Sequence, residues 1–184
     1  DRSFDASLPK LSIAYDWSDR TTVGLLAQRA FNPGGTTISL VTCAPDDFEA
    51  ETLWNFEAFL RYASSDGRAR LSANVFRSEL RDAQRPQLAN VVPCGLSASR
   101  SLIGNAPSAR TEGAELQLDW RATDRLDVRV GVGILDTRTL RTELPGDPAR
   151  GREFQRAPAV SGSAQLVFRP AAAWRISGSV AAHG

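Results

Sequence analysis

Apolar and polar side chains alternate along most of this chain with a period of two residues. The pattern is clearest in residues 51–80, where every second residue is apolar in 54–62 and again in 69–75. Residues 64–67 interrupt it, and an Asp-Gly turn between two alternating runs predicts a β-hairpin. Each run covers about ten residues, against about five or six for a typical soluble strand. Because about ten tilted residues also span a bilayer, the apolar face of this hairpin is expected to contact either protein or lipid.

Six further segments show the same alternation, and short turns near residues 19, 66, 123 and 171 join all eight segments in pairs. The six segments are residues 9–17, 22–30, 112–120, 126–134, 160–168 and 174–180. The pairs are separated by segments without alternation, at residues 31–50, 81–110 and 139–156, which we expect to be long loops. An up-and-down order places all short turns at one end and all long loops at the other, which is typical of outer-membrane barrels. No segment shows a helical period of 3.6 residues.

Aromatic side chains recur on the apolar face beside the short turns. They are Trp17, Tyr62, Trp120, Phe168 and Trp174. Tryptophan and tyrosine suit a lipid–water boundary because the ring is apolar while its polar group stays in water. The pattern predicts an aromatic girdle, although the same residues could instead close the end of a soluble sandwich core.

The opposite face of the predicted strands carries many charges, among them Glu57, Arg61, Glu115, Asp119 and Arg129. A soluble core would not tolerate so many. The outer surface of a soluble β-sandwich would tolerate them, so charge alone does not separate a sandwich from a membrane barrel. Strand length and loop asymmetry decide between these two folds. They predict an all-β fold: a section of an up-and-down antiparallel transmembrane β-barrel, with about eight long strands, short periplasmic turns and long extracellular loops.

Composition narrows the function further. The chain has 184 residues and a net charge of +1, which gives no reason to expect a nucleic-acid partner. It has no run of about 18 apolar residues, so no transmembrane helix is expected. It begins at Asp1 without a Met or a signal peptide, so we interpret it as a fragment or a processed piece.

Catalytic chemistry is poorly supplied. His183 is the only histidine, two cysteines are present, and no Gly-x-Ser-x-Gly, Walker or zinc motif occurs. The acids at Asp16, Glu57, Glu115 and Asp119 lie at alternating positions, which a charged lumen explains without catalysis. The sequence predicts neither an enzyme nor a cofactor or metal site.

Several stretches, in order and with matching spacing, resemble a known family. They are residues 9–16, 22–35 ending in Phe-Asn-Pro-Gly-Gly, 51–57, 66–76, 105–106, 111–116, 133–136 and 157–158. Together they resemble the β-barrel of TonB-dependent outer-membrane receptors. This resemblance implies a plugged barrel of roughly 22 strands. Residues 1–184 are then expected to be part of the barrel domain, with the plug domain and the terminal strands absent.

The resemblance implies active uptake of a scarce nutrient across the bacterial outer membrane, such as a ferric siderophore or a similar iron complex. The implied partners are outer-membrane lipid and lipopolysaccharide, a small-molecule chelate, and the TonB complex acting through the absent plug and TonB box. A soluble β-sandwich binding module of the carbohydrate-binding type is the alternative, and an outer-membrane enzyme is a weaker one.

Substrate contacts are expected from the three long loops. Arg81, Arg85, Arg100 and Arg110 are candidates because arginine attracts an anionic chelate, although arginine is also ordinary in loops and in surfaces facing lipopolysaccharide. Cys43 and Cys94 fall in neighbouring loops at the same predicted end. The expected compartment is oxidising, so they form either a disulfide or two unpaired small residues.

Overall fold

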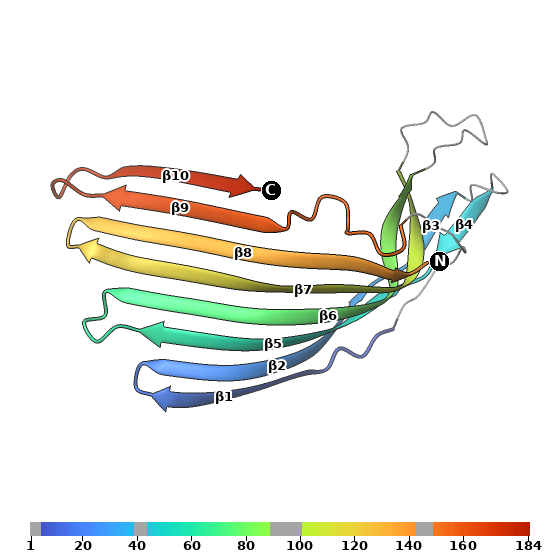
Figure 1. The fold of residues 1–184 in the computed structure, drawn as a ribbon, viewed down its shortest axis with the longest axis horizontal. Coiled ribbons are helices and arrows are strands. Elements are labelled where there is room, and N and C mark those ends of the chain that lie inside the picture. Colours follow the sequence, from blue (N-terminus) through green and yellow to red (C-terminus); the bar gives the residue numbers. More distant parts are fainter. Residues whose placement is uncertain (1–4, 39–43, 89–100, 143–148) are drawn as a thin grey trace.

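The computed structural model describes residues 5–38, 44–88, 101–142 and 149–184. These residues form two antiparallel sheets and no helix. The larger sheet has eight strands in the order β1-β2-β5-β6-β7-β8-β9-β10, and the smaller sheet pairs β3 with β4 (Figure 1). The prediction of an up-and-down, all-β section with about eight main strands is confirmed.

The main strands range from 8 to 23 residues. They are β1 (Lys10–Ser18), β2 (Thr21–Asn32), β5 (Glu51–Ala63), β6 (Ala69–Leu88), β7 (Ser101–Thr123), β8 (Leu126–Arg141), β9 (Val160–Phe168) and β10 (Ile176–His183). The small sheet consists of β3 (Gly35–Ile38) and β4 (Pro45–Phe48).

Short turns lie together at one end of the sheet and the longer connections at the other, here called the turn end and the loop end (Figure 1). The turn between β5 and β6 shows how the local sequence closes a hairpin. Gly67 has a φ of 68°, which glycine adopts without strain. The Asp66 carboxylate accepts hydrogen bonds from the Ser64 hydroxyl and the Arg68 amide, and these lower the pKa of Asp66.

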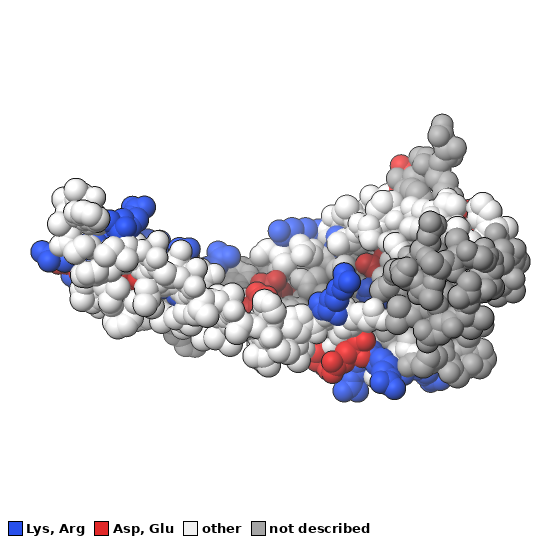
Figure 2. Space-filling model, turned by 90° about the horizontal axis from the view of Figure 1, so that it is seen from above, with Lys and Arg blue, Asp and Glu red and all other residues white. Residues whose placement is uncertain are grey.

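One side of the sheet, which we call the apolar face, carries hydrophobic side chains and is not covered by other described residues. Leu11, Val75 and Ile134 are more than half exposed, at 66%, 56% and 55%. Among the described residues no second layer packs on this face, and the only other sheet is the small β3–β4 pair. Figure 2 shows the main sheet as a curved trough with largely uncharged atoms along much of its convex side. This single layer argues against a β-sandwich, whose two sheets would bury these side chains against each other.

The predicted aromatic positions lie on the apolar face near the turn end. Trp17 and Trp174 are the most exposed, at 74% and 68%, and Tyr62, Trp120 and Phe168 are exposed as well. Rings with this exposure cannot be plugging a core. They are placed as the aromatic girdle of a membrane barrel requires.

The opposite side, the polar face, is closely packed at two glycines. The ring of Phe59 on β5 lies over Gly24 on β2, and the ring of Phe76 on β6 lies over Gly113 on β7. A Cβ at Gly24 would meet Phe59 Cζ at 2.3 Å, so only a residue without a side chain leaves room for the ring. Each aromatic ring thereby covers the neighbouring backbone.

Three predicted loops are more ordered than expected. Residues 81–88 and 101–110 extend β6 and β7, and residues 139–141 extend β8. Residues 31–50 contain the last residues of β2 and the whole of strands β3 and β4. The expectation of irregular structure was wrong at these positions. Residues 149–156 are irregular as predicted, while residues 39–43, 89–100 and 143–148 of the predicted loops lie outside the described residues.

Two prolines and one unusual backbone angle explain why the strand extensions are hard to predict. Pro86 and Pro107 both lie within the paired strands although proline has no amide proton to donate. Asp82 has a φ of 52°. Between the Arg81–Ser108 and Ala83–Ala106 pairs, Asp82 and Pro107 are skipped. The alternation that marks a strand in sequence is therefore lost where the strand continues.

Candidate functional site at the loop end of the sheet

Charged and polar groups line the polar face along its length. Arg129 Nε lies 2.5 Å from Asp119 Oδ1, and Gln117 donates to the same carboxylate at 2.9 Å. Asn74 and Glu115 pair across β6 and β7. These groups keep contact with water in the described chain, so the face is suited to an aqueous lumen or to a hydrophilic protein surface. It is unsuited to lipid.

Within the described ranges, the buried residues lie at the loop end. Of the described hydrophobic residues, those that are buried are Leu80, Ala83, Ala106 and Ala109, from β6 and β7. Leu53 of β5 and Phe154 of the β8–β9 connection pack against them, and Thr137 and Thr139 of β8 are buried as well. This loop-end cluster fixes the point where the long connections leave the sheet.

Phe154 anchors the β8–β9 connection to the cluster. Its amide donates to the Thr137 hydroxyl at 2.8 Å, and the Gly151 amide donates to the Thr139 carbonyl at 2.7 Å. The guanidinium of Arg85 lies over the Phe154 ring, 3.6 Å from its centroid. A cation over an aromatic face is attracted to the ring electrons, and the attraction grows where water is excluded. The contact therefore ties the β8–β9 connection to β6.

Amide side chains anchor the β2–β5 connection in the same region. Gln84 Nε2 donates to the carbonyls of Pro33 at 2.8 Å and Glu49 at 3.2 Å. Asn105 bonds Glu49 in both directions, accepting from its amide at 2.7 Å and donating to its carbonyl at 3.0 Å. The β6–β7 extension thus contacts both neighbouring connections, and we call these three segments together the loop-end platform.

The four predicted arginines occupy different surroundings. Arg85 lies in the platform, where Nη1 is 4.0 Å from Glu51 Oε2 while Nε and Nη2 are buried with no hydrogen-bond partner among the described residues. Burial lowers the pKa of Arg85, and the Glu51 charge opposes this. Arg81 and Arg110 share the face of Arg77 and Glu112 by strand register. Arg100, like Cys43 and Cys94, lies outside the described residues, so the disulfide stays a prediction.

Sequence reasoning missed Gln84, Asn105, Thr137 and Phe154, which build the platform. Each is an ordinary residue in a stretch without clear alternation, and only the folded register brings them together. The described part of the chain holds no group of three His, Cys, Asp or Glu residues arranged to bind a metal ion. It also contains no helix long and apolar enough to cross a membrane.

Replacing Phe154 by alanine is expected to loosen the β8–β9 connection. The change removes the ring contacts with Arg85 and the cluster, and a local loss of about 1–2 kcal/mol raises the open population about 5- to 30-fold. Arg150, Arg152 and Arg156 flank the ring, so trypsin added to intact cells should cut there faster, which peptide mass spectrometry would detect. Glu153→Ala, at the exposed neighbouring position, is the control. Equal cleavage of both variants would contradict the anchoring role.

Comparison with known families decides the identity of this fold. Residues 1–183 match the family model described as TonB dependent receptor-like, beta-barrel. The chain belongs to this family. The resemblance drawn from the sequence is thereby confirmed, and the TonB-dependent receptor barrel described here belongs in the bacterial outer membrane.

Solved structures agree with the family assignment. The ferric yersiniabactin uptake receptor FyuA from Yersinia pestis superposes with a TM-score of 0.70 at 19% identity, covering 95% of this chain and 25% of FyuA. The ferric preacinetobactin receptor BauA from Acinetobacter baumannii gives 0.68 at 14% identity, covering 97% and 26%. The copper transporter OprC gives 0.66 at 12% identity, covering 92% and 25%. These likenesses establish the fold, and the chain spans about a quarter of the length of each of these three proteins.

Proposed function

We propose that this chain forms part of the barrel wall of a receptor that imports a scarce nutrient across the outer membrane. The observation that carries the proposal is a single curved sheet with an uncovered apolar face, a charged polar face and long connections anchored at its loop end. Both outermost strands, β1 and β10, pair on one side only within the described sheet. Further strands, a plug domain and coupling to the TonB complex complete the receptor in this proposal.

A ferric siderophore or similar iron complex is the proposed substrate. FyuA and BauA, which share the fold, are described as receptors for iron complexes. In this chain, Arg85 is the best placed of the predicted arginines to meet an anionic chelate. It belongs to the loop-end platform, and its Nε and Nη2 have no hydrogen-bond partner in the part of the chain that the structure describes. Arg81 and Arg110 share the other face by register, which makes them weaker candidates.

The test is iron uptake by cells that carry the whole receptor as their only outer-membrane route for a given iron complex. We expect labelled iron to accumulate from at least one ferric siderophore of a panel, and uptake to stop when the proton gradient is dissipated. The washed outer-membrane fraction should contain the receptor. Failure of every iron complex to bind or enter would overturn the proposed substrate class.

Arg85→Gln is expected to weaken binding of an anionic iron complex about 10- to 150-fold, because a hydrogen bond to a charged group contributes about 1.5–3 kcal/mol. Binding would be measured on the purified whole receptor by titration. Arg81→Gln is the matched control, since it removes the same charge from the same strand on the other face. Arg85→Lys should restore part of the affinity if charge is what the ligand requires. If Arg85→Gln binds the iron complex as tightly as the unaltered receptor, Arg85 is not a ligand contact.

A further inference from the structure

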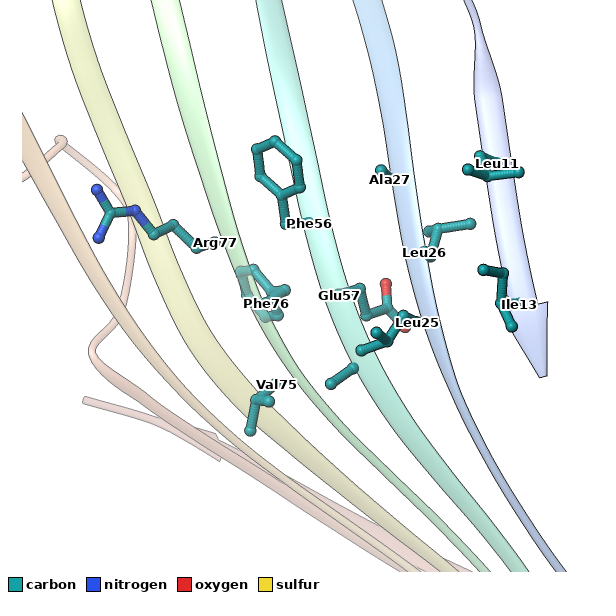
Figure 3. Close-up of a pocket in the computed structure, with 11 residues that line it drawn as sticks. Leu11, Ile13, Leu25, Leu26, Ala27, Phe56, Glu57, Val75, Phe76 and Arg77 are labelled. Atoms are coloured by element: carbon teal, nitrogen blue, oxygen red, sulfur yellow. The ribbon is translucent and has the colours of Figure 1, made fainter. Parts of the chain in front are cut away.

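Two hollows on opposite faces of the sheet differ in their chemistry. The hollow on the apolar face, about 560 Å³, is lined largely by hydrophobic side chains such as Leu11, Leu25, Phe56 and Val75 (Figure 3). It lies on the lipid-facing side of the barrel wall, so it indicates no further ligand. The hollow on the polar face, about 360 Å³, lies at the turn end and is lined mainly by charged side chains. Figure 2 shows basic side chains gathered at this end of the sheet.

Alternate positions on four neighbouring strands and their turns supply the charged and polar lining of the second hollow. These residues, which we call the arginine pocket, are Arg68, Arg70, Asp119, Arg121, Asp127, Arg129, Gln165 and Arg169. Four of them, Arg70, Asp119, Arg129 and Gln165, stand opposite one another in a single row across β6, β7, β8 and β9. Because side chains alternate between the faces of a strand, this register places the pocket on the polar face.

The arginine pocket carries more positive than negative charge. Its lining has five arginines and two aspartates, and Asp124, which pairs with Arg68 at 2.6 Å, reduces the excess from three charges to two. Arg70 lies near Asp119, yet it forms no ion pair or hydrogen bond with another side chain that the structure describes. Arg121 is 66% exposed and only 3.6 Å from Asp127, so it too can accept a further anionic partner.

Backbone hydrogen bonds between neighbouring turns hold the arginine pocket in shape. The Arg121 amide donates to the Arg68 carbonyl at 2.7 Å, and the Arg169 amide donates to the Arg125 carbonyl at 2.7 Å. A preformed hollow of about 360 Å³ lies within the range of about 300–1,000 Å³ that is usual for small-molecule sites. Its size and charge therefore suit a small anion.

We propose that the arginine pocket binds a small oxyanion with at least two carboxylate or phosphate groups. Guanidinium groups bind such oxygens in pairs and stay charged at physiological pH. Arg70 and Arg129 stand two strands apart, about 10 Å between their backbones, so two anionic groups of one ligand can each meet one arginine. The pocket lies at the opposite end of the polar face from Arg85, so it is a second anion site.

Two sources of such an oxyanion can reach the turn end. One is the anionic iron complex after it leaves the loop-end platform, and this assignment rests on the proposed function. The other is a phosphate compound of the periplasm, the compartment that the short turns are expected to face. The two sources share the chemistry of the ligand and differ in whether a change in the pocket alters iron uptake.

Isothermal titration of the purified whole receptor with inorganic pyrophosphate tests the site without any iron complex. We expect saturable binding that weakens as salt is added, and a loss of affinity of about tenfold or more in Arg70→Gln. Adding Arg121→Gln should weaken binding further, and Asp127 keeps its pair with Arg169 in that variant. Arg70→Lys should restore part of the affinity. Arg20→Gln removes the same charge from an exposed position in the β1–β2 turn, outside the pocket, and should bind as the unaltered receptor does.

Iron uptake by cells that carry the same variants distinguishes the two sources. If the iron complex is the ligand, Arg70→Gln should slow uptake at saturating concentrations of the complex, while the affinity of the loop-end platform stays unchanged. If a phosphate compound is the ligand, uptake should keep the unaltered rate although the affinity for pyrophosphate falls. Heat-dependent migration on gels verifies that each variant is folded.

Three results would overturn the proposal. The first is an unaltered receptor that does not bind pyrophosphate, which is also expected if an acidic segment of the receptor fills the pocket. The second is a folded double variant, Arg70→Gln with Arg121→Gln, that binds as tightly as the unaltered receptor. The third is an equal loss in Arg20→Gln, because binding would then follow the overall charge of the turn end. Failure of all iron uptake would refute the proposed function and leave the pyrophosphate titration to decide this site.

Discussion

An arginine in place of Leu116 is expected to destabilise the membrane-inserted receptor by about 2–4 kcal/mol, the cost of a cation near the bilayer midplane on the lipid side of a barrel. Leu116 lies midway along the apolar face of β7, between Ala73 and Val132, and is 46% exposed. The free energy of unfolding would be measured by urea titration of the whole receptor in lipid vesicles.

Gln117→Arg is the matched control. It places the same charge one residue later on the same strand, on the polar face between Glu115 and Asp119, where a cation has partners. We expect its unfolding free energy to change by less than about 0.5 kcal/mol, as for an ordinary exposed substitution. Equal destabilisation by the two arginines would mean that lipid does not cover the apolar face, and the membrane placement of this sheet would fail with it.

Valine at Gly113 is expected to lower stability by about 1–3 kcal/mol, the usual cost of forcing atoms into a packed site. A Cβ there would lie 2.3 Å from the Ile134 carbonyl oxygen and 2.8 Å from Phe76 Cζ. The ring can rotate away, but the backbone of β8 can move only by disturbing its hydrogen bonds to β7. The same urea titration would report the loss.

Gly178→Val separates this steric effect from the general effect of replacing a strand glycine. A Cβ at Gly178 meets nothing within 4 Å in the described chain, and its strand partner is Leu166 on the apolar face. Valine there should be neutral or slightly stabilising because β-branched residues favour strands. In a second arm, Phe76→Ala combined with Gly113→Val should recover part of the stability. A Gly113→Val receptor as stable as the unaltered one would refute the packing argument.

The sequence was sufficient to predict the eight strands because each strand separates two unlike environments. Residues such as Leu116 and Gln117 must then alternate, and a period of two remains readable without any relative for comparison. The predicted aromatic girdle follows from the same logic, since Trp17, Trp120 and Trp174 combine the apolar face with a position beside a turn.

The loop end could not be predicted in the same way, because its strands no longer separate a lipid-facing side from a polar side. At the loop end one face of β6 and β7 packs on the loop-end cluster, so the contrast between lipid and water that produces alternation elsewhere no longer selects the residues. In the sequence, Pro86 and Pro107 therefore indicate loops, although both residues lie within strands. The platform depends on long-range partners, such as Arg85 with Phe154 and Gln84 with Pro33, that no local pattern reveals.

The strand order has a consequence for how such a wall is built and altered. In the described sheet, the backbone of each main strand pairs only with the main strands that precede and follow it along the chain, with the short β3–β4 sheet inserted between β2 and β5. Each hairpin is consequently a module that mainly requires a neighbouring strand edge to pair with. Repeat proteins behave in a similar way, since their stability is a sum of the stabilities of single repeats and of the interfaces between neighbours. A sheet of this kind can assemble by pairing one hairpin at a time. Hairpins can also be exchanged or duplicated, because no core shared by distant strands has to be repacked.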